Sequence, residues 1–141
     1  MKNLKSYILI AMVAVLFSSC AKNLSVNFQT NSENTGSIVI ALTAPLKGSV
    51  LTVDDKLLVD KEFVKKITIK NVPVGDHDVN FSSDSWQYQT NVNEKFKIKT
   101  EKEKESAKIV TRPPYSTGYY VLWGGEIIAD IIFIIFVLPH N

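Results

Sequence analysis

Between Gly36 and Val110 the chain consists of short segments in which apolar and polar residues alternate, and these segments end at turn signals. Nothing in this range repeats its apolar residues with the period of an amphipathic helix. Alternation at every second position is typical of strands that bury one face, and closely spaced turn residues favour hairpins. The pattern therefore predicts a mainly β protein, in which six or seven short strands form a small antiparallel β-sandwich.

Clusters of Pro, Gly and Asp mark turns at Pro45–Gly48, Asp54–Lys56 and Val74–Asp76. Trp86 and Tyr88 alternate with glutamines, so their rings would share one face of a strand, and we expect both to pack in the core. The expected strands cover residues 37–44, 49–53, 57–59, 63–69 and 107–110, together with the alternating pairs Val79 and Phe81, Trp86 and Tyr88, and Phe96 and Ile98.

Three segments, residues 36–40, 48–55 and 72–79, resemble PEGA-type domains, which are small β-sandwiches common on bacterial envelope proteins. The most specific part is a Pro-x-Gly-x-His-x-Val pattern, formed by Pro73, Gly75, His77 and Val79. The chain departs from the family at Asp55, where Gly is usual, at residues 61–63, where Thr-Pro is usual, and at Trp86, where Gly-Tyr is usual. The resemblance implies a PEGA-like β-sandwich over residues 36–112, with a binding or spacer role and no catalysis.

The N-terminus is organised around Cys20, the only cysteine in the chain. A short basic stretch, residues 1–5, precedes an apolar run, residues 6–17, that is too short to span a bilayer. Ser18 and Ser19 are small residues directly before Cys20. This layout resembles the lipobox of bacterial lipoproteins, although Phe17 occupies the position where Leu is commonest. The resemblance implies a helical signal peptide over residues 1–19, cleavage between Ser19 and Cys20, and acyl chains on Cys20.

Lipidation of Cys20 would fix the partner and the location of the mature chain. Each buried methylene contributes ~0.8 kcal/mol, so several acyl chains hold a protein firmly on membrane lipid. Neither a retention Asp nor an acidic cluster follows Cys20, which favours the periplasmic face of the outer membrane. Removing Lys2 and Lys5 from the 16 basic residues leaves 14, equal to the 14 acidic residues. We therefore expect no nucleic-acid partner.

Residues 20–35 are rich in Asn, Ser and Thr, which predicts a flexible tether before the β-sandwich. An alternative is a first edge strand, because Leu24, Val26 and Phe28 alternate with polar residues.

Residues 113–141 begin with two prolines that cannot continue a sheet, and an almost wholly apolar segment, residues 118–138, follows. As a helix this segment would be ~31 Å long, close to the thickness of a hydrocarbon core. Glu126 and Asp130 are four residues apart and would share one helical face, where they could contact a protein partner. We expect a membrane-associated helix here, and a core strand or hairpin is the alternative.

No set of residues with the spacing required for catalysis is present. His77 lies between Asp76 and Asp78, but neighbouring strand residues point to opposite faces, so we expect a structural His77 and no metal site. The mixed-sign run at residues 101–105 predicts either a solvated hairpin loop or a short helical turn. The sequence therefore predicts a non-enzymatic, membrane-anchored envelope lipoprotein without a cofactor, acting as a binding or assembly module. The alternative is a subunit of a membrane transport or secretion complex.

Overall fold

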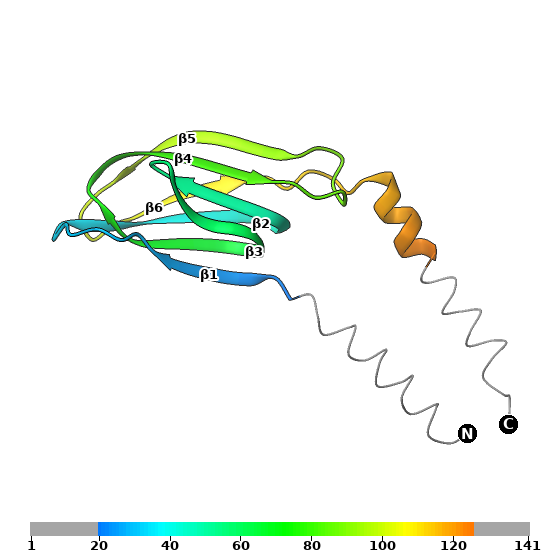
Figure 1. The fold of residues 1–141 in the computed structure, drawn as a ribbon, viewed down its shortest axis with the longest axis horizontal. Coiled ribbons are helices and arrows are strands. Elements are labelled where there is room, and N and C mark those ends of the chain that lie inside the picture. Colours follow the sequence, from blue (N-terminus) through cyan, green and yellow to red (C-terminus); the bar gives the residue numbers. More distant parts are fainter. Residues whose placement is uncertain (1–19, 126–141) are drawn as a thin grey trace, which may run out of the picture.

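The computed structural model describes residues 20–125, which form a mainly β protein with one short helix at residues 117–125 (Figure 1). The predicted signal peptide, with Ser19 at its cleavage site, and the predicted partner residues Glu126 and Asp130 lie outside the described residues. The strands are β1 (Lys22–Asn27), β2 (Thr35–Val53), β3 (Lys56–Pro73), β4 (Gly75–Ser83), β5 (Val92–Thr100) and β6 (Glu105–Val110).

The six strands belong to one mixed sheet, and this corrects the prediction of a purely antiparallel arrangement. The order is β1-β3-β2-β4-β5, and β6 pairs with β2 outside this path. Strands β1 and β3 are parallel, as are β2 and β6, whereas the other pairs are antiparallel. The parallel pairs join segments that are far apart in the sequence, so no hairpin signal could indicate them.

Strand β2 bends near its middle, and its two parts pair with different strands. Residues 37–42 pair with β6, whereas residues 49–53 pair with β4. The predicted turn at Pro45–Gly48 lies at this bend, where the register with β3 shifts between Ala41 and Ser49. Gly48 has φ +65°, a left-handed conformation that glycine adopts without strain. The turn signal therefore marks a bend within a continuous strand.

The core contains the apolar side chains of β2, β3 and β4, whose alternating burial confirms the two-residue period seen in the sequence. Its largest fully buried members are Phe81, Ile38, Ile40, Leu46, Leu51, Ile67, Ile69, Val53, Val64, Val72, Val79 and Val110.

Residues 22–27 form strand β1, so the alternative of an edge strand is confirmed and the predicted tether is wrong over this stretch. Leu24 and Val26 are partly buried against the core, while the polar residues between them are exposed. Burial of this apolar face outweighs the polar composition that favoured a tether. Cys20 is therefore separated from the first strand by one residue only.

Candidate functional site

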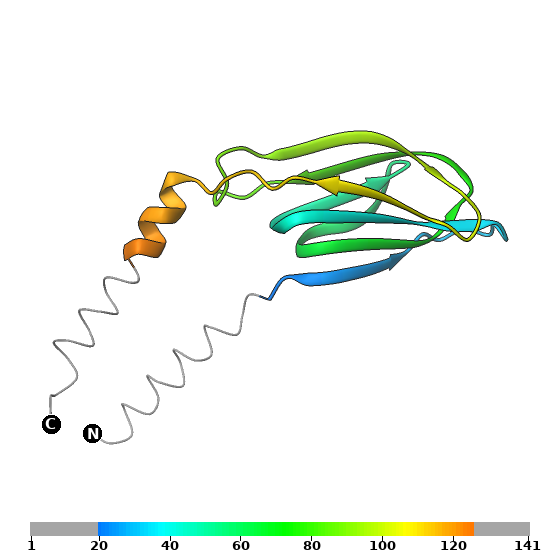
Figure 2. The same ribbon diagram turned by 180° about the vertical axis from the view of Figure 1, so that it is seen from behind.

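The two ends of the β domain differ in chemistry, and the end that carries Cys20 is called the Cys20 end. Figures 1 and 2 show that β1 begins at the same end of the domain from which the helix at residues 117–125 leaves. Residue pairing brings the β2 bend to this end, because Val64 is opposite both Lys22 of β1 and Leu46 of β2. Cys20 itself is exposed. The predicted lipidation site and the start of the apolar C-terminal segment thus lie at one end.

A stack of aromatic rings joins the helix to the domain. The rings of Tyr88 and Tyr115 stack with centroids 5.8 Å apart, and those of Tyr115 and Tyr119 stack at 4.3 Å. Trp86 lies 6.2 Å from Tyr119, and the Arg112 guanidinium lies 4.1 Å above the Tyr115 ring. Such ring pairs and cation–π contacts each add stabilisation beyond the area they bury.

Backbone hydrogen bonds fix the same junction. The amide of Ser116 donates to the Gln87 carbonyl at 2.7 Å, and the amide of Gln89 donates to the Pro114 carbonyl at 3.0 Å. The Ser116 hydroxyl donates to the Trp86 carbonyl at 2.9 Å and accepts from the Tyr119 amide at 3.2 Å. The second contact makes Ser116 the N-cap of the helix. The helix therefore begins in a direction set by the loop that carries Trp86.

Beyond this junction the helix exposes apolar side chains on every side. Tyr120, Val121, Leu122 and Trp123 are each 57–69% exposed, and Trp86, whose ring lies near that of Tyr119 in the same helix, is 63% exposed. These five residues are called the aromatic surface. A helix that is apolar all round is normally buried in protein or lipid, and large exposed apolar patches mark interaction sites. Within residues 20–125, no helix is long and apolar enough to cross a membrane.

Of the two aromatic residues expected in the core, one is buried there and the other is not. Tyr88 is buried as predicted, and its hydroxyl accepts from the Lys47 amide at 3.1 Å. Burial raises the pKa of the Tyr88 hydroxyl above its usual value. Trp86, predicted to share that core position, instead lies in a turn with its ring exposed. The prediction failed because residues 84–87 are not a strand, so the two-residue period does not apply to them.

At the opposite end, the segments that carry the resemblance contact each other through His77. Nδ1 of this buried ring lies 2.6 Å from Oδ2 of Asp54, and Nε2 lies 2.8 Å from the Pro73 carbonyl oxygen. Oδ1 of Asp54 accepts from the amide of Asp78 at 3.0 Å. Both ring nitrogens of His77 contact oxygen atoms of other segments. His77 thus joins the β2–β3 hairpin to β4, in agreement with the expected structural role.

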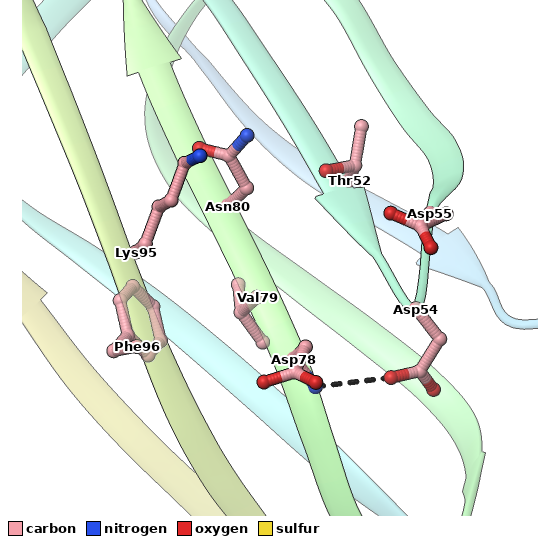
Figure 3. Close-up of a pocket in the computed structure, with 8 residues that line it drawn as sticks. All are labelled: Thr52, Asp54, Asp55, Asp78, Val79, Asn80, Lys95 and Phe96. Atoms are coloured by element: carbon pink, nitrogen blue, oxygen red, sulfur yellow. Dashed lines mark hydrogen bonds between the residues drawn. The ribbon is translucent and has the colours of Figure 1, made fainter.

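A shallow polar pocket of about 470 Å³ lies next to Asp54 and is lined by residues of β2, β4 and β5 (Figure 3). Thr52, Asn80 and Lys95 lie side by side across the three strands, and Oδ1 of Asn80 is buried without a hydrogen-bond partner among the described residues. In the part of the chain that the structure describes, no group of three or more His, Cys, Asp or Glu residues is placed to hold a metal ion.

The charged run at residues 101–105 lies in an exposed loop and at the start of β6, as its composition indicated. Glu101 and Lys104 form an ion pair of 2.5 Å, and their hydrogen bond lowers the pKa of Glu101 and raises that of Lys104. Both side chains are well exposed, so the pair adds little to stability.

A comparison of the sequence with protein-family models and with curated proteins finds no match to either.

Proposed function

We propose that this chain is a non-enzymatic lipoprotein of the bacterial envelope, anchored through acylated Cys20 and acting as a binding or assembly module. The observation that carries this proposal is the position of Cys20, exposed beside the first strand, at the end from which the apolar helix leaves. Acyl chains on Cys20 and the exposed apolar helix would then meet the same membrane. The proposed location is the periplasmic face of the outer membrane.

We further propose that the domain is a PEGA-like β-sandwich. Its two layers would be built on the two parts of β2, one paired with β6 and the other with β4. The contact between Asp54 and His77 supports this, because it links two of the segments that resemble the family. Such a module would present the end opposite Cys20 to a partner. A binding or assembly role of this kind requires no cofactor.

The test is mass spectrometry of the mature N-terminus together with membrane fractionation. Trypsin should release a peptide of residues 20–22 with a diacylglycerol on the Cys20 sulfur and an acyl group on its amine. A Cys20→Ala variant should lack this modification. A free, unacylated Cys20 in the mature protein would overturn the proposal. Stable co-purification with a membrane transporter or secretion channel would favour the alternative, a subunit of a membrane transport or secretion complex.

A further inference from the structure

From the aromatic surface, we infer that the Cys20 end of the β domain lies directly on the bilayer, with Trp86 and Trp123 in the interfacial region. The inference rests on the proposed lipid anchor and adds an orientation to it. A lipid anchor alone would allow the domain to rotate freely above the membrane. A domain that keeps its Cys20 end against the headgroups is called seated.

The first argument is the chemistry of the exposed residues. Trp and Tyr are enriched where membranes meet water, because their rings are apolar and their N–H or O–H groups remain hydrated. Trp86, Tyr120 and Trp123 are all more than half exposed, and Val121 and Leu122 lie on the same helix. Amphipathic helices at membrane surfaces place their apolar side chains ~5–10 Å into the boundary between headgroups and acyl chains, and this is the depth expected for exposed apolar side chains at the interface. The bilayer interface therefore matches this surface in both its apolar and its polar parts.

The second argument is continuity with the chain on either side. Cys20 lies at this end of the domain, and the helix leads in sequence into the apolar run of residues 127–138. Both proposed membrane elements thus start from the end that carries the aromatic surface. An anchor at Cys20 would hold this end, and no other, within a few ångströms of the headgroups.

The third argument is charge. Basic residues outnumber acidic ones in the segments at the Cys20 end, residues 20–22, 43–48, 60–65, 84–91 and 111–125. The reverse holds in the segments at the opposite end, residues 28–34, 54–56, 73–76 and 101–105. At the Cys20 end these are Lys22, Lys47, Lys61, Lys65 and Arg112 against Asp60, Glu62 and Asp84. At the opposite end they are Lys56, Lys102 and Lys104 against Glu33, Asp54, Asp55, Asp76, Glu101, Glu103 and Glu105. Anionic lipid would attract the first end and repel the second.

Trp86 is the residue whose environment reports whether the β domain itself is seated. Trp123 is on the helix and would enter lipid wherever the apolar segment goes, with or without the β domain. Trp86 is in the loop after β4, so it reaches the interface only if the domain itself is seated. These are the only two tryptophans in the chain, so each can be isolated by a single substitution.

The experiment uses the mature, lipidated full chain in vesicles of phosphatidylcholine with and without phosphatidylglycerol. Trp123→Phe leaves Trp86 as the only tryptophan, and Trp86→Phe leaves Trp123. The matched control places Asn31→Trp at the opposite end in a chain that lacks both native tryptophans. Flotation with the vesicles measures anchoring, and quenching by lipids brominated near the headgroup end of the acyl chains measures seating.

We expect all three variants to float, and we expect Trp86 and Trp123 to emit at shorter wavelength and lose intensity with brominated lipid. The Asn31→Trp control should keep the emission of an exposed indole. Phosphatidylglycerol should increase the quenching of Trp86, and salt should reduce that increase. Flotation with Trp86 quenched no more than the control would overturn the seating and leave the anchor intact. A blue shift that follows protein concentration but not bromine would assign the surface to a second copy, and loss of flotation would overturn both proposals.

Discussion

Replacement of Asp54 by Ala tests whether the contact with His77 holds the β2–β3 hairpin to β4. The substitution removes the acceptor of the His77 Nδ1 contact at 2.6 Å and of the Asp78 amide at 3.0 Å. The His77 side chain is 8% exposed, so its Nδ1 atom would lose its partner inside the protein. The contact of Nε2 with the Pro73 carbonyl oxygen would remain, because Asp54 takes no part in it.

The expected loss of unfolding free energy follows from these two hydrogen bonds. A hydrogen bond to a charged group contributes about 1.5–3 kcal/mol, and the lower figure applies because the Asp54 side chain is 41% exposed. The two contacts together then amount to about 3 kcal/mol. Asp54 also has φ 48°, a left-handed conformation in which Asp is tolerated better than Ala. Asp55 has φ 61° in the same turn, and its side chain makes no hydrogen bond to any residue that the structure describes, so Asp55→Ala is the matched control.

Urea unfolding of the mature protein in detergent, followed by far-UV circular dichroism, measures the difference. We expect Asp54→Ala to lower the unfolding free energy by about 3 kcal/mol more than Asp55→Ala, with the same dependence on urea. In a double-mutant cycle, His77→Ala should cost less in the Asp54→Ala background than in the wild type. Equal losses for the two Asp variants, within about 0.5 kcal/mol, would refute the reasoning.

Two further substitutions test contacts at the Cys20 end by thermal unfolding. Gly48→Ala should lower stability by about 1–3 kcal/mol, because φ is +65° and a Cβ atom would overlap the Asp84 carbonyl oxygen. The control Gly124→Ala should not lower stability, because a Cβ atom there would meet no atom of residues 20–125 within 4 Å. Tyr88→Phe should cost about 1–3 kcal/mol because the Lys47 amide loses its acceptor. Since burial raises the Tyr88 pKa, its contribution is complete below about pH 10 and declines as the pH rises through the raised pKa, so Tyr88→Phe should lack this part of the alkaline loss.

The strands could be predicted from the sequence because a buried face imposes a two-residue period. Alternation in β2, β3 and β4 indicated the strands, and their apolar residues form the core. The pairing could not be predicted to the same extent. Which strand lies beside β2 depends on contacts between distant segments, as in the parallel pair with β6, and such contacts leave no local signal.

The candidate site shows the same division between local and distant contacts. The Pro-x-Gly-x-His-x-Val pattern indicated a structural role for His77, but not its partner, because Asp54 reaches it only through the pairing of β2 with β4. Trp86 was missed because the loop around it is held by Pro114 and Ser116, which are distant in sequence. The helix start at Ser116 had a local signal, since a Ser directly before a helical segment is a common N-cap.

The junction between helix and domain determines what the proposed seating would achieve. If the helix were joined by a free linker, lipid could hold it without any effect on the orientation of the β strands. Ser116 instead has both its amide and its hydroxyl bonded to the loop of Trp86, and the rings of Tyr115 and Tyr119 stack beside that loop. A change in helix direction would break several of these contacts at once. A helix lying in the interface would therefore orient the whole domain, and the acidic end with Asp54 would face away from the membrane toward a partner.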